Sequence, residues 1–234
     1  SIAIIVGGTG QFGVLLAEKL LKKKYKVIIT TRSVIKAKKK IKKKIFNFKK
    51  LNVLAKSEIK KLLLKNKPKI IFYTASQSSP GKSFKNKKET YLSNYIGCKN
   101  FLEIIKKYKV ECKFVNFSSC EIYGNYKKKI SVETIKKPIS PYGVAKLKAH
   151  NLTKYYRDNY NLKSYNAIIF NTESYFRPKY YLVPKICLAA IKAKEKNIKT
   201  EFGNLNISRE WNWCDEQCKY LIIFVNKKPQ DFIL

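Results

Sequence analysis

Two residues in the second half of the chain could transfer a proton together. Tyr142 and Lys146 stand four positions apart at the start of an expected helix, so both side chains lie on one helical face. An ammonium group beside a phenol favours the phenolate and lowers the tyrosine pKa, which suits a base that removes a hydroxyl proton. The same spacing also arises by chance, because the chain holds 16 tyrosines and many lysines.

A second group of polar residues precedes this pair. An expected strand ends at Ser118 and is followed by Ser119 and Glu121. Strand ends in open parallel sheets are where ligands bind. Ser119 can donate a hydrogen bond to a substrate hydroxyl, and the Glu121 carboxylate can act on a different carbon. The alternative is that Glu121 only pairs with a surface lysine, but the combined spacing favours a catalytic set of Ser119, Glu121, Tyr142 and Lys146.

The beginning of the chain contains a glycine motif of the kind that binds phosphate. Gly7, Gly10 and Gly13 lie between an apolar run at 2–6 and an expected helix at 11–23. Small residues there let the backbone approach a pyrophosphate, which then sits on the helix N-terminus. A glycine turn without a ligand is the alternative, and the strand-before, helix-after context favours a dinucleotide.

The end of the second expected strand indicates which dinucleotide. An acidic residue there would hold a ribose 2′-hydroxyl, but the chain has Arg32 and Ser33. Both suit a 2′-phosphate, so the sequence favours NADP over NAD. The alternative is that Arg32 is one more surface cation of a basic protein.

Apolar runs alternate with helical patterns through most of the chain. The expected strands are 2–6, 26–30, 69–74, 113–118 and 164–171, and the expected helices are 11–23, 56–66, 89–108 and 141–160. The lysine-rich run at 36–50 is expected to be a solvated helix and loop. This alternation predicts an α/β fold, a Rossmann-type doubly wound parallel sheet. The last residues resemble a strand cut off in mid-course, so we expect the fold to be incomplete at the C-terminus.

The charge and hydropathy of the chain indicate which classes of binding partner to expect. The 51 basic and 15 acidic residues give a net charge of +36, but the lysines are scattered among Ile, Asn and Tyr along the chain. Scattered lysines favour a compositional bias, so no nucleic-acid partner is expected, although the charge would attract an anionic ligand. No apolar run reaches the roughly 18 residues of a membrane-spanning helix, so no membrane partner is expected.

The six cysteines indicate thiols rather than a metal site. The only close pair is Cys214 and Cys218, a C-x3-C spacing without a nearby histidine, which is poor for zinc. We therefore expect no bound metal and a reducing, cytoplasmic location.

Several motifs together resemble the extended short-chain dehydrogenases, the NAD-dependent epimerase/dehydratase group. These are the glycine loop, Ala-Ser-Gln-Ser at 75–78, Ser-Ser-Cys-Glu-Ile-Tyr-Gly at 118–124 and Ser-Pro-Tyr-Gly-Val-Ala-Lys at 140–146. Two later segments narrow the match. Phe-Asn-Thr-Glu-Ser at 170–174 and Gly-Asn-Leu-Asn-Ile-Ser-Arg-Glu-Trp at 203–211 look like the F-N-H-E-S and G-N-L-D-A-K-R-D-W stretches of the GDP-mannose 4,6-dehydratases.

The resemblance implies a role for each matching position. NADP would be bound by Gly7, Gly10, Gly13, Arg32, Asn52, Ala75, Tyr142, Lys146 and Arg177, and the nucleotide sugar by Ser78, Asn171, Lys185 and Arg209. Residues 1–170 would form the NADP-binding Rossmann domain. Residues 171–234 would form part of a smaller sugar-nucleotide-binding region, whose final helix and strand return to the sheet. The implied partners are GDP-mannose and further copies of the chain, in a dimer or a tetramer.

The chain departs from the family pattern at several positions. Ser119 replaces a threonine and keeps the hydroxyl, whereas Asn52 stands where an aspartate meets the adenine. Trp213 replaces a histidine, and Tyr175-Phe176 replaces a Pro-Arg pair. The loop that joins subunits in the family's tetramers is not recognisable at 33–44, which leaves tetramer assembly open.

The resemblance implies an internal redox dehydration of GDP-mannose. The enzymatic alternatives are a nucleotide-sugar epimerase and a 4-keto-6-deoxy sugar reductase on the same scaffold. An alternative of another class is a dinucleotide- or RNA-binding relative that has lost turnover. An intact Ser-Tyr-Lys set argues against that alternative, and the high charge argues mildly for it.

Overall fold

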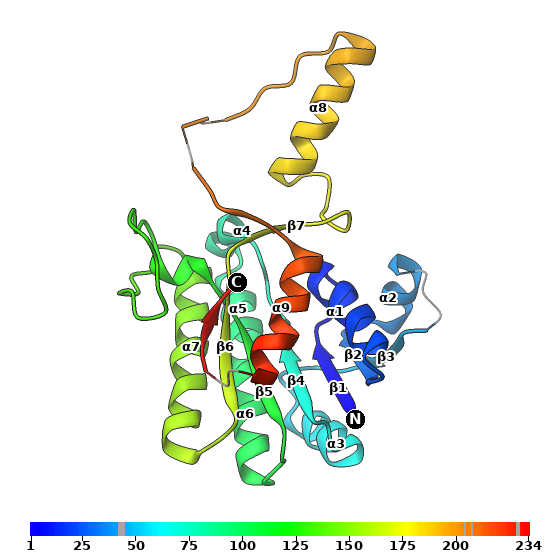
Figure 1. Cartoon of the computed structure of the whole chain (residues 1–234), viewed down its shortest axis with the longest axis vertical. Coiled ribbons are helices and arrows are strands. Elements are labelled where there is room, and N and C mark those ends of the chain that lie inside the picture. The colour runs from blue at the N-terminus through cyan, green and yellow to red at the C-terminus, as the bar shows by residue number, and fades with distance from the viewer. Residues whose placement is uncertain (42–44, 204, 207, 228–229) are drawn as a thin grey trace.

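The computed structural model of the protein describes residues 1–41, 45–203, 205–206, 208–227 and 230–234 (Figure 1). Its strands are β1 (Ile2–Val6), β2 (Lys26–Thr31), β3 (Asn47–Lys50), β4 (Ile70–Tyr73), β5 (Lys113–Ser119), β6 (Ser164–Ile169), β7 (Asn171–Glu173), β8 (Trp211–Trp213) and β9 (Phe232–Ile233). Its α-helices are α1 (Gln11–Lys22), α2 (Val34–Lys40), α3 (Lys56–Asn66), α4 (Pro80–Lys85), α5 (Lys87–Tyr91), α6 (Gly97–Lys107), α7 (Pro141–Tyr160), α8 (Leu182–Lys196) and α9 (Cys214–Lys227). A π-helical turn, η1 (Leu92–Ile96), and a 3₁₀ turn, η2 (Cys120–Tyr123), complete them.

Within the described residues, seven parallel strands form one sheet in the order β3-β2-β1-β4-β5-β6-β9. The chain runs outward from β1 in one direction and outward from β4 in the other. This order is the doubly wound topology that the sequence predicts, and its switch point lies between β1 and β4. Ligands of such sheets bind outside the carboxyl ends of the strands at that point.

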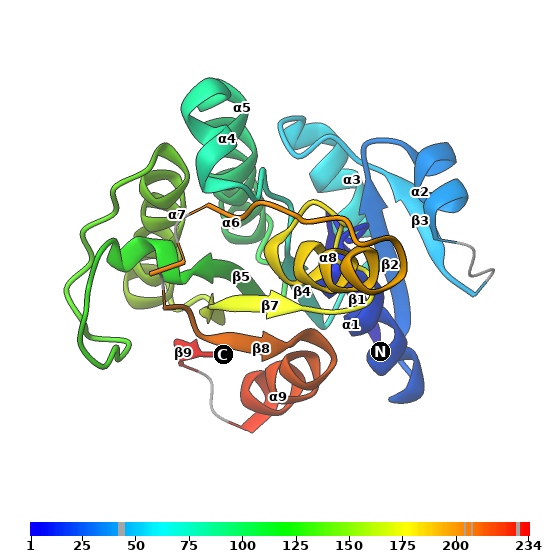
Figure 2. The same cartoon turned by 90° about the horizontal axis from the view of Figure 1, so that it is seen from above.

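Helices cover both faces of the sheet (Figure 2). On β1, Ala3 and Ile5 pack into a cluster with α1 and α9, whereas Ile4 and Val6 pack on the opposite face with α3, α6 and α7. Successive side chains of a strand point to opposite faces, so a strand buried on both sides appears as an unbroken apolar run. Such runs at β1, β2 and β4 made these central strands predictable.

The expected helix at 89–108 is interrupted by the π-helical turn η1. Tyr73 from β4 donates a hydrogen bond to the Ser93 carbonyl oxygen, 2.6 Å away, inside this turn. A Cβ on Gly97 would come within 2.1 Å of the Tyr73 hydroxyl oxygen. The wide π-helical turn and Gly97 after it therefore leave room for the Tyr73 side chain between this helical segment and the sheet.

The region after β6 differs most from the expectation. The strand expected at 164–171 ends at Ile169, and residues 171–173 instead form β7, which pairs with β8 in a separate two-stranded sheet. This pair crosses above the carboxyl ends of the main strands (Figure 1). Helix α8, which no sequence pattern indicated, stands above it and has no buried residue.

The lysine-rich run at 36–50 is also more structured than expected. It contains part of α2 and an edge strand, β3, which pairs with β2. Residues 42–44, part of the segment compared with the family's subunit-joining loop, lie outside the described residues. No helix in the described part of the chain is long and apolar enough to cross a membrane.

Candidate active site

The glycine loop joins β1 to α1 and lies against the residues that follow β4. Gly7 has a φ of +73°, and a Cβ there would come within 2.5 Å of the Ala75 Cα atom. A Cβ on Gly13 would meet the Gly8 carbonyl oxygen at 2.2 Å, whereas a Cβ on Gly10 would meet no described atom within 4 Å. The fold itself requires the first and third glycines. Gly10 keeps the N-terminus of α1 open to an anion.

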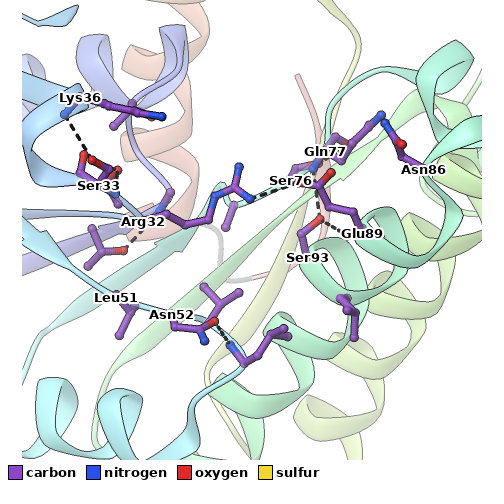
Figure 3. Close-up of a pocket in the computed structure, with 18 of the residues that line it drawn as sticks. Arg32, Ser33, Lys36, Leu51, Asn52, Ser76, Gln77, Asn86, Glu89 and Ser93 are labelled. Carbon is purple, nitrogen blue, oxygen red and sulfur yellow. Dashed lines mark hydrogen bonds and ion pairs between the residues drawn. The ribbon is translucent and has the colours of Figure 1, made fainter. Parts of the chain in front are cut away.

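A cavity of about 900 Å³ extends from this loop along the ends of β2, β3 and β4, and we call it the β2 cavity. Gly7, Arg32, Asn52 and Ala75, four residues predicted to bind the cofactor, line it. Arg32 reaches across the cavity, and its guanidinium lies 3.1 Å from a carboxylate oxygen of Glu89 on α5 (Figure 3). Both side chains are largely exposed.

A second cavity, of about 560 Å³, lies on the other side of the glycine loop, and we call it the catalytic cavity. β5, η2 and α7 contribute the residues of the proposed catalytic set. The structure brings all four together with the glycine motif: the lining includes Gly7, Gly10, Gly13, Ser119, Glu121, Tyr142 and Lys146.

The start of α7 places Tyr142 beside η2. Ser140 caps the helix by accepting a hydrogen bond from the Gly143 amide, 3.0 Å away, and a proline occupies the first turn. A Cβ on Gly143 would lie 2.6 Å from the Glu121 carbonyl oxygen. The Ser-Pro-Tyr-Gly motif therefore both starts the helix and lets its first turn approach the end of β5.

The electrostatics of Tyr142 differ from the expectation. Burial raises its pKa, and hydrogen bonding to Ser119 and Ser76 lowers it only in part. The Lys146 ammonium donates to the Phe117 carbonyl oxygen, 2.7 Å away, and lies 5.7 Å from the centre of the tyrosine ring. Burial also lowers the pKa of Lys146 to about 8, although Cys98 raises it. Desolvation is the largest cause of both pKa shifts.

Glu121 has an environment suited to proton transfer. Its backbone amide donates to the Ser119 hydroxyl oxygen, 3.3 Å away, so the two candidates are held as a unit. Burial raises the pKa of its carboxyl group, while the charge of Arg209 lowers it. A carboxyl group with a raised pKa exchanges protons closer to neutral pH than an exposed glutamate does.

The sequence of the chain matches a known protein family. A sequence model of the family described as GDP-mannose 4,6 dehydratase matches residues 4–234. The chain belongs to the GDP-mannose 4,6-dehydratase family.

Members of this family from distant organisms match the whole chain. The GDP-mannose 4,6-dehydratase of Vibrio cholerae is 30% identical over 248 residues, covering 100% of this chain and 66% of that protein. The GDP-mannose 4,6 dehydratase of Homo sapiens is 29% identical over 260 residues, covering 100% and 67%. The chain thus spans about two thirds of the length of these curated relatives.

Solved structures support the fold. The UDP-glucose 4-epimerase of Thermus thermophilus, in complex with NAD, superposes with a TM-score of 0.86 at 18% identity, covering 100% of this chain and 77% of that one. The dTDP-glucose 4,6-dehydratase of Bacillus anthracis, also in complex with NAD, gives 0.84 at 22% identity, covering 100% and 74%. At these identities the likeness concerns the fold alone.

Three residues that the GDP-mannose 4,6-dehydratase resemblance singled out also line the catalytic cavity: Ser78, Asn171 and Arg177. The Arg177 guanidinium lies 3.7 Å above the ring of Tyr181, and its Nε lies 3.2 Å from a Glu173 carboxylate oxygen. The Arg177 side chain is therefore fixed at the rim from two sides.

The remaining two substrate candidates are not in the lining of either cavity. Lys185 lies on α8, where its ammonium donates to the Glu201 carbonyl oxygen, 2.9 Å away. The charge of Arg209 lowers the pKa of Glu121, which burial raises. Two residues of its motif, Asn204 and Ile207, lie outside the described residues.

Sequence reasoning missed several residues at these cavities. Gln11, directly after the glycine motif, donates to the Thr172 carbonyl oxygen at 3.0 Å and accepts from the Ser174 hydroxyl at 2.7 Å. Its position next to Gly10 was a signal that could have been read. Lys40 lines both cavities. Nothing in the sequence distinguished it from the many other lysines of the chain. In the described part of the chain, no group of three or more His, Cys, Asp or Glu side chains could hold a metal ion.

Proposed function

We propose that the protein catalyses the NADP-dependent dehydration of a nucleotide sugar, with GDP-mannose as substrate and GDP-4-keto-6-deoxymannose as product. The observation that carries this proposal is the convergence of Ser119, Glu121, Tyr142 and Lys146 on one cavity beside the glycine loop. The family membership supports the choice of reaction and substrate.

The residues present fit a dinucleotide. The loop at Gly7 is pressed against Ala75, Gly10 is open, and the first turn of α1 carries no acidic residue that would repel a pyrophosphate. Arg32 lines the β2 cavity, where its guanidinium could bind a 2′-phosphate. When bound, the dinucleotide supplies the chemistry of accepting a hydride from the sugar and giving it back.

The chain's own residues would move the protons. Tyr142 takes the proton of the 4-hydroxyl group while Ser119 holds the same oxygen by a hydrogen bond. Oxidation at C4 acidifies the C5 proton, which passes to the Glu121 carboxylate. The two protons taken from the 4-hydroxyl group and from C5 balance the two that are needed, one by the C6 hydroxyl as it leaves as water and one by C5 when the hydride is added at C6. The Lys146 ammonium, on the same helical face and 5.7 Å from the centre of the tyrosine ring, would favour the phenolate by its charge. Because C4 loses a hydride and C6 gains one, the product is a 4-keto-6-deoxy sugar and no net oxidation occurs.

The direct test is to incubate the protein and NADP with a panel of nucleotide sugars and to follow loss of one water by mass spectrometry. We expect GDP-mannose to lose water. Tyr142→Phe should reduce turnover by about 10²–10⁴-fold, the usual contribution of a general acid–base group, with cofactor binding nearly intact. If NADP binds but no member of the panel loses water, the dehydratase proposal is wrong, and inversion or reduction at C4 becomes the expected activity.

A further inference from the structure

Helix α2 begins directly after Arg32 and presents two lysines to the β2 cavity. Ser33 caps it by accepting a hydrogen bond from the Lys36 amide. Lys36 and Lys40 stand four positions apart, on one helical face, and both line the cavity. Lys39, which precedes Lys40, is exposed and does not line it. Helix α2 therefore adds positive charge to one side of the β2 cavity, and this charge is separate from the glycine motif.

Lys40 lies where the two cavities meet. Among the described residues, Gly7, Thr9, Lys40 and Ser76 line both cavities, and only the lysine carries a charge. Its ammonium donates to the Thr9 carbonyl oxygen, 3.0 Å away, inside the glycine loop. The end of α2 is thereby held over the N-terminus of α1, the position where a pyrophosphate is expected to bind.

The contact with Thr9 leaves the lysine able to bind an anion. A backbone carbonyl positions the ammonium without neutralising it, and no carboxylate in the described part of the chain makes an ion pair with Lys40. An ammonium group has three donors, so two remain for phosphate oxygens. Lysine serves proteins as a point charge for phosphates in this way.

We propose that Lys40 binds the pyrophosphate of the dinucleotide, a role separate from that of Arg32 at the 2′-phosphate. This inference rests on the proposed function, because it needs a dinucleotide in the two cavities. The pyrophosphate is common to NAD and NADP, whereas the 2′-phosphate belongs to NADP alone. Loss of Lys40 should therefore weaken both cofactors equally.

The test is calorimetric titration of the wild-type protein and Lys40→Gln with NAD and with NADP. We expect Lys40→Gln to lose about tenfold in affinity for each, the effect of one charge-assisted contact, with the ratio between the cofactors unchanged. Lys39→Gln, the matched control on the same helix, should stay within about twofold of wild type. Lys40→Arg should retain most of the affinity.

Three results would overturn the assignment in different ways. A loss confined to NADP would place Lys40 at the 2′-phosphate. Unchanged affinities for both cofactors would leave it only a tether between α2 and the glycine loop. If the wild-type protein binds neither cofactor, the proposed function fails first, and this inference fails with it.

Discussion

At the scale of single residues, the guanidinium of Arg32 has a competitor for any anion that binds near it, the carboxylate of Glu89. An exposed ion pair contributes roughly 0–1 kcal/mol, whereas a hydrogen bond to a charged partner contributes about 1.5–3 kcal/mol. A 2′-phosphate should therefore displace Glu89 from Arg32. The ion pair of Arg32 and Glu89 lies across the β2 cavity.

We expect Arg32→Ala to weaken NADP binding by on the order of 1.5–3 kcal/mol and NAD binding little. Glu89→Gln removes the competing charge and should strengthen NADP binding slightly. Titration of each variant with both cofactors measures this. Equal losses for NAD and NADP in Arg32→Ala would remove the 2′-phosphate argument.

The sequence was most informative about residues whose partners are close along the chain. Ser119 with Glu121, and Tyr142 with Lys146, could be placed because each pair belongs to one strand end or one helical turn. Burial of Ser119, Tyr142 and Lys146 could not be read from spacing, and it raises the pKa of Tyr142, which the spacing predicted to be lowered. The pairing of Arg32 with Glu89 joins distant segments and has no local signature.

At the scale of elements, Gln11 connects the glycine loop to the segment after β6, which also lines the catalytic cavity. Its amide joins the first turn of α1 to the segment that follows β6, through Thr172 and Ser174. A mutation there should disturb the proposed sugar pocket more than the glycine loop, because the loop is held by backbone hydrogen bonds to Thr30 and by its contact with Ala75. Gln11 is therefore a positioning residue in this arrangement.

We expect Gln11→Ala to raise the KM for the nucleotide sugar several-fold while the dinucleotide affinity changes less. Gln11→Glu should be intermediate, because its carboxylate can still accept from Ser174 but cannot donate to Thr172. Steady-state kinetics together with cofactor titration separate the two effects. A larger loss of cofactor affinity than of substrate binding would refute this role.

Helix α8 and strands β7 and β8 escaped prediction for physical reasons. The central strands and α1, α3, α6 and α7 face the core and carry its apolar periodicity. Helix α8 has no buried residue, so no core-facing stripe marks it. Strands β7 and β8 pair only with each other in the described part of the chain, and both are too short to show an alternation.

At the scale of the whole molecule, a buried polar network joins the last strand to the catalytic one. Asp231, just before β9, accepts hydrogen bonds from Arg157 of α7 and from the backbone and side chain of Asn166 on β6. His150 of α7 lies 4.0 Å from the same carboxylate and 3.2 Å from the Ser118 hydroxyl. The network thus connects β9, α7, β6 and β5.

This network should make the fold sensitive to acid. The pKa of His150 is lowered to about 4, chiefly by burial; the charge of Asp231 raises it, and those of Lys136, Arg157 and Lys154 lower it. Between the ordinary value of 6.5 and about 4, the unfolded chain binds a proton that the folded chain does not, so stability falls as the pH falls through this window. Asp231, whose pKa is also lowered, adds a loss at lower pH.

We expect the free energy of unfolding, measured with urea, to decrease from pH 7 to pH 5. His150→Asn cannot take up this proton and should show a flatter pH dependence. An equally steep dependence in the variant would mean that His150 is not the group responsible.

The proposed reaction is redox-neutral over a full cycle, because the hydride that leaves C4 returns at C6. Glu121 is the residue that links the two halves, since elimination requires a base for the C5 proton. Glu121→Gln keeps the shape of the side chain but cannot accept that proton, so oxidation at C4 should proceed and elimination should stall.

The decisive measurement is rapid mixing of Glu121→Gln, loaded with NADP, with GDP-mannose, following the near-ultraviolet absorbance of the reduced cofactor. We expect reduced cofactor to accumulate and persist without any 6-deoxy product, whereas the wild-type protein shows only a small transient signal. Elimination of water by Glu121→Gln at the wild-type rate would contradict the role of Glu121 and, with it, the dehydratase mechanism.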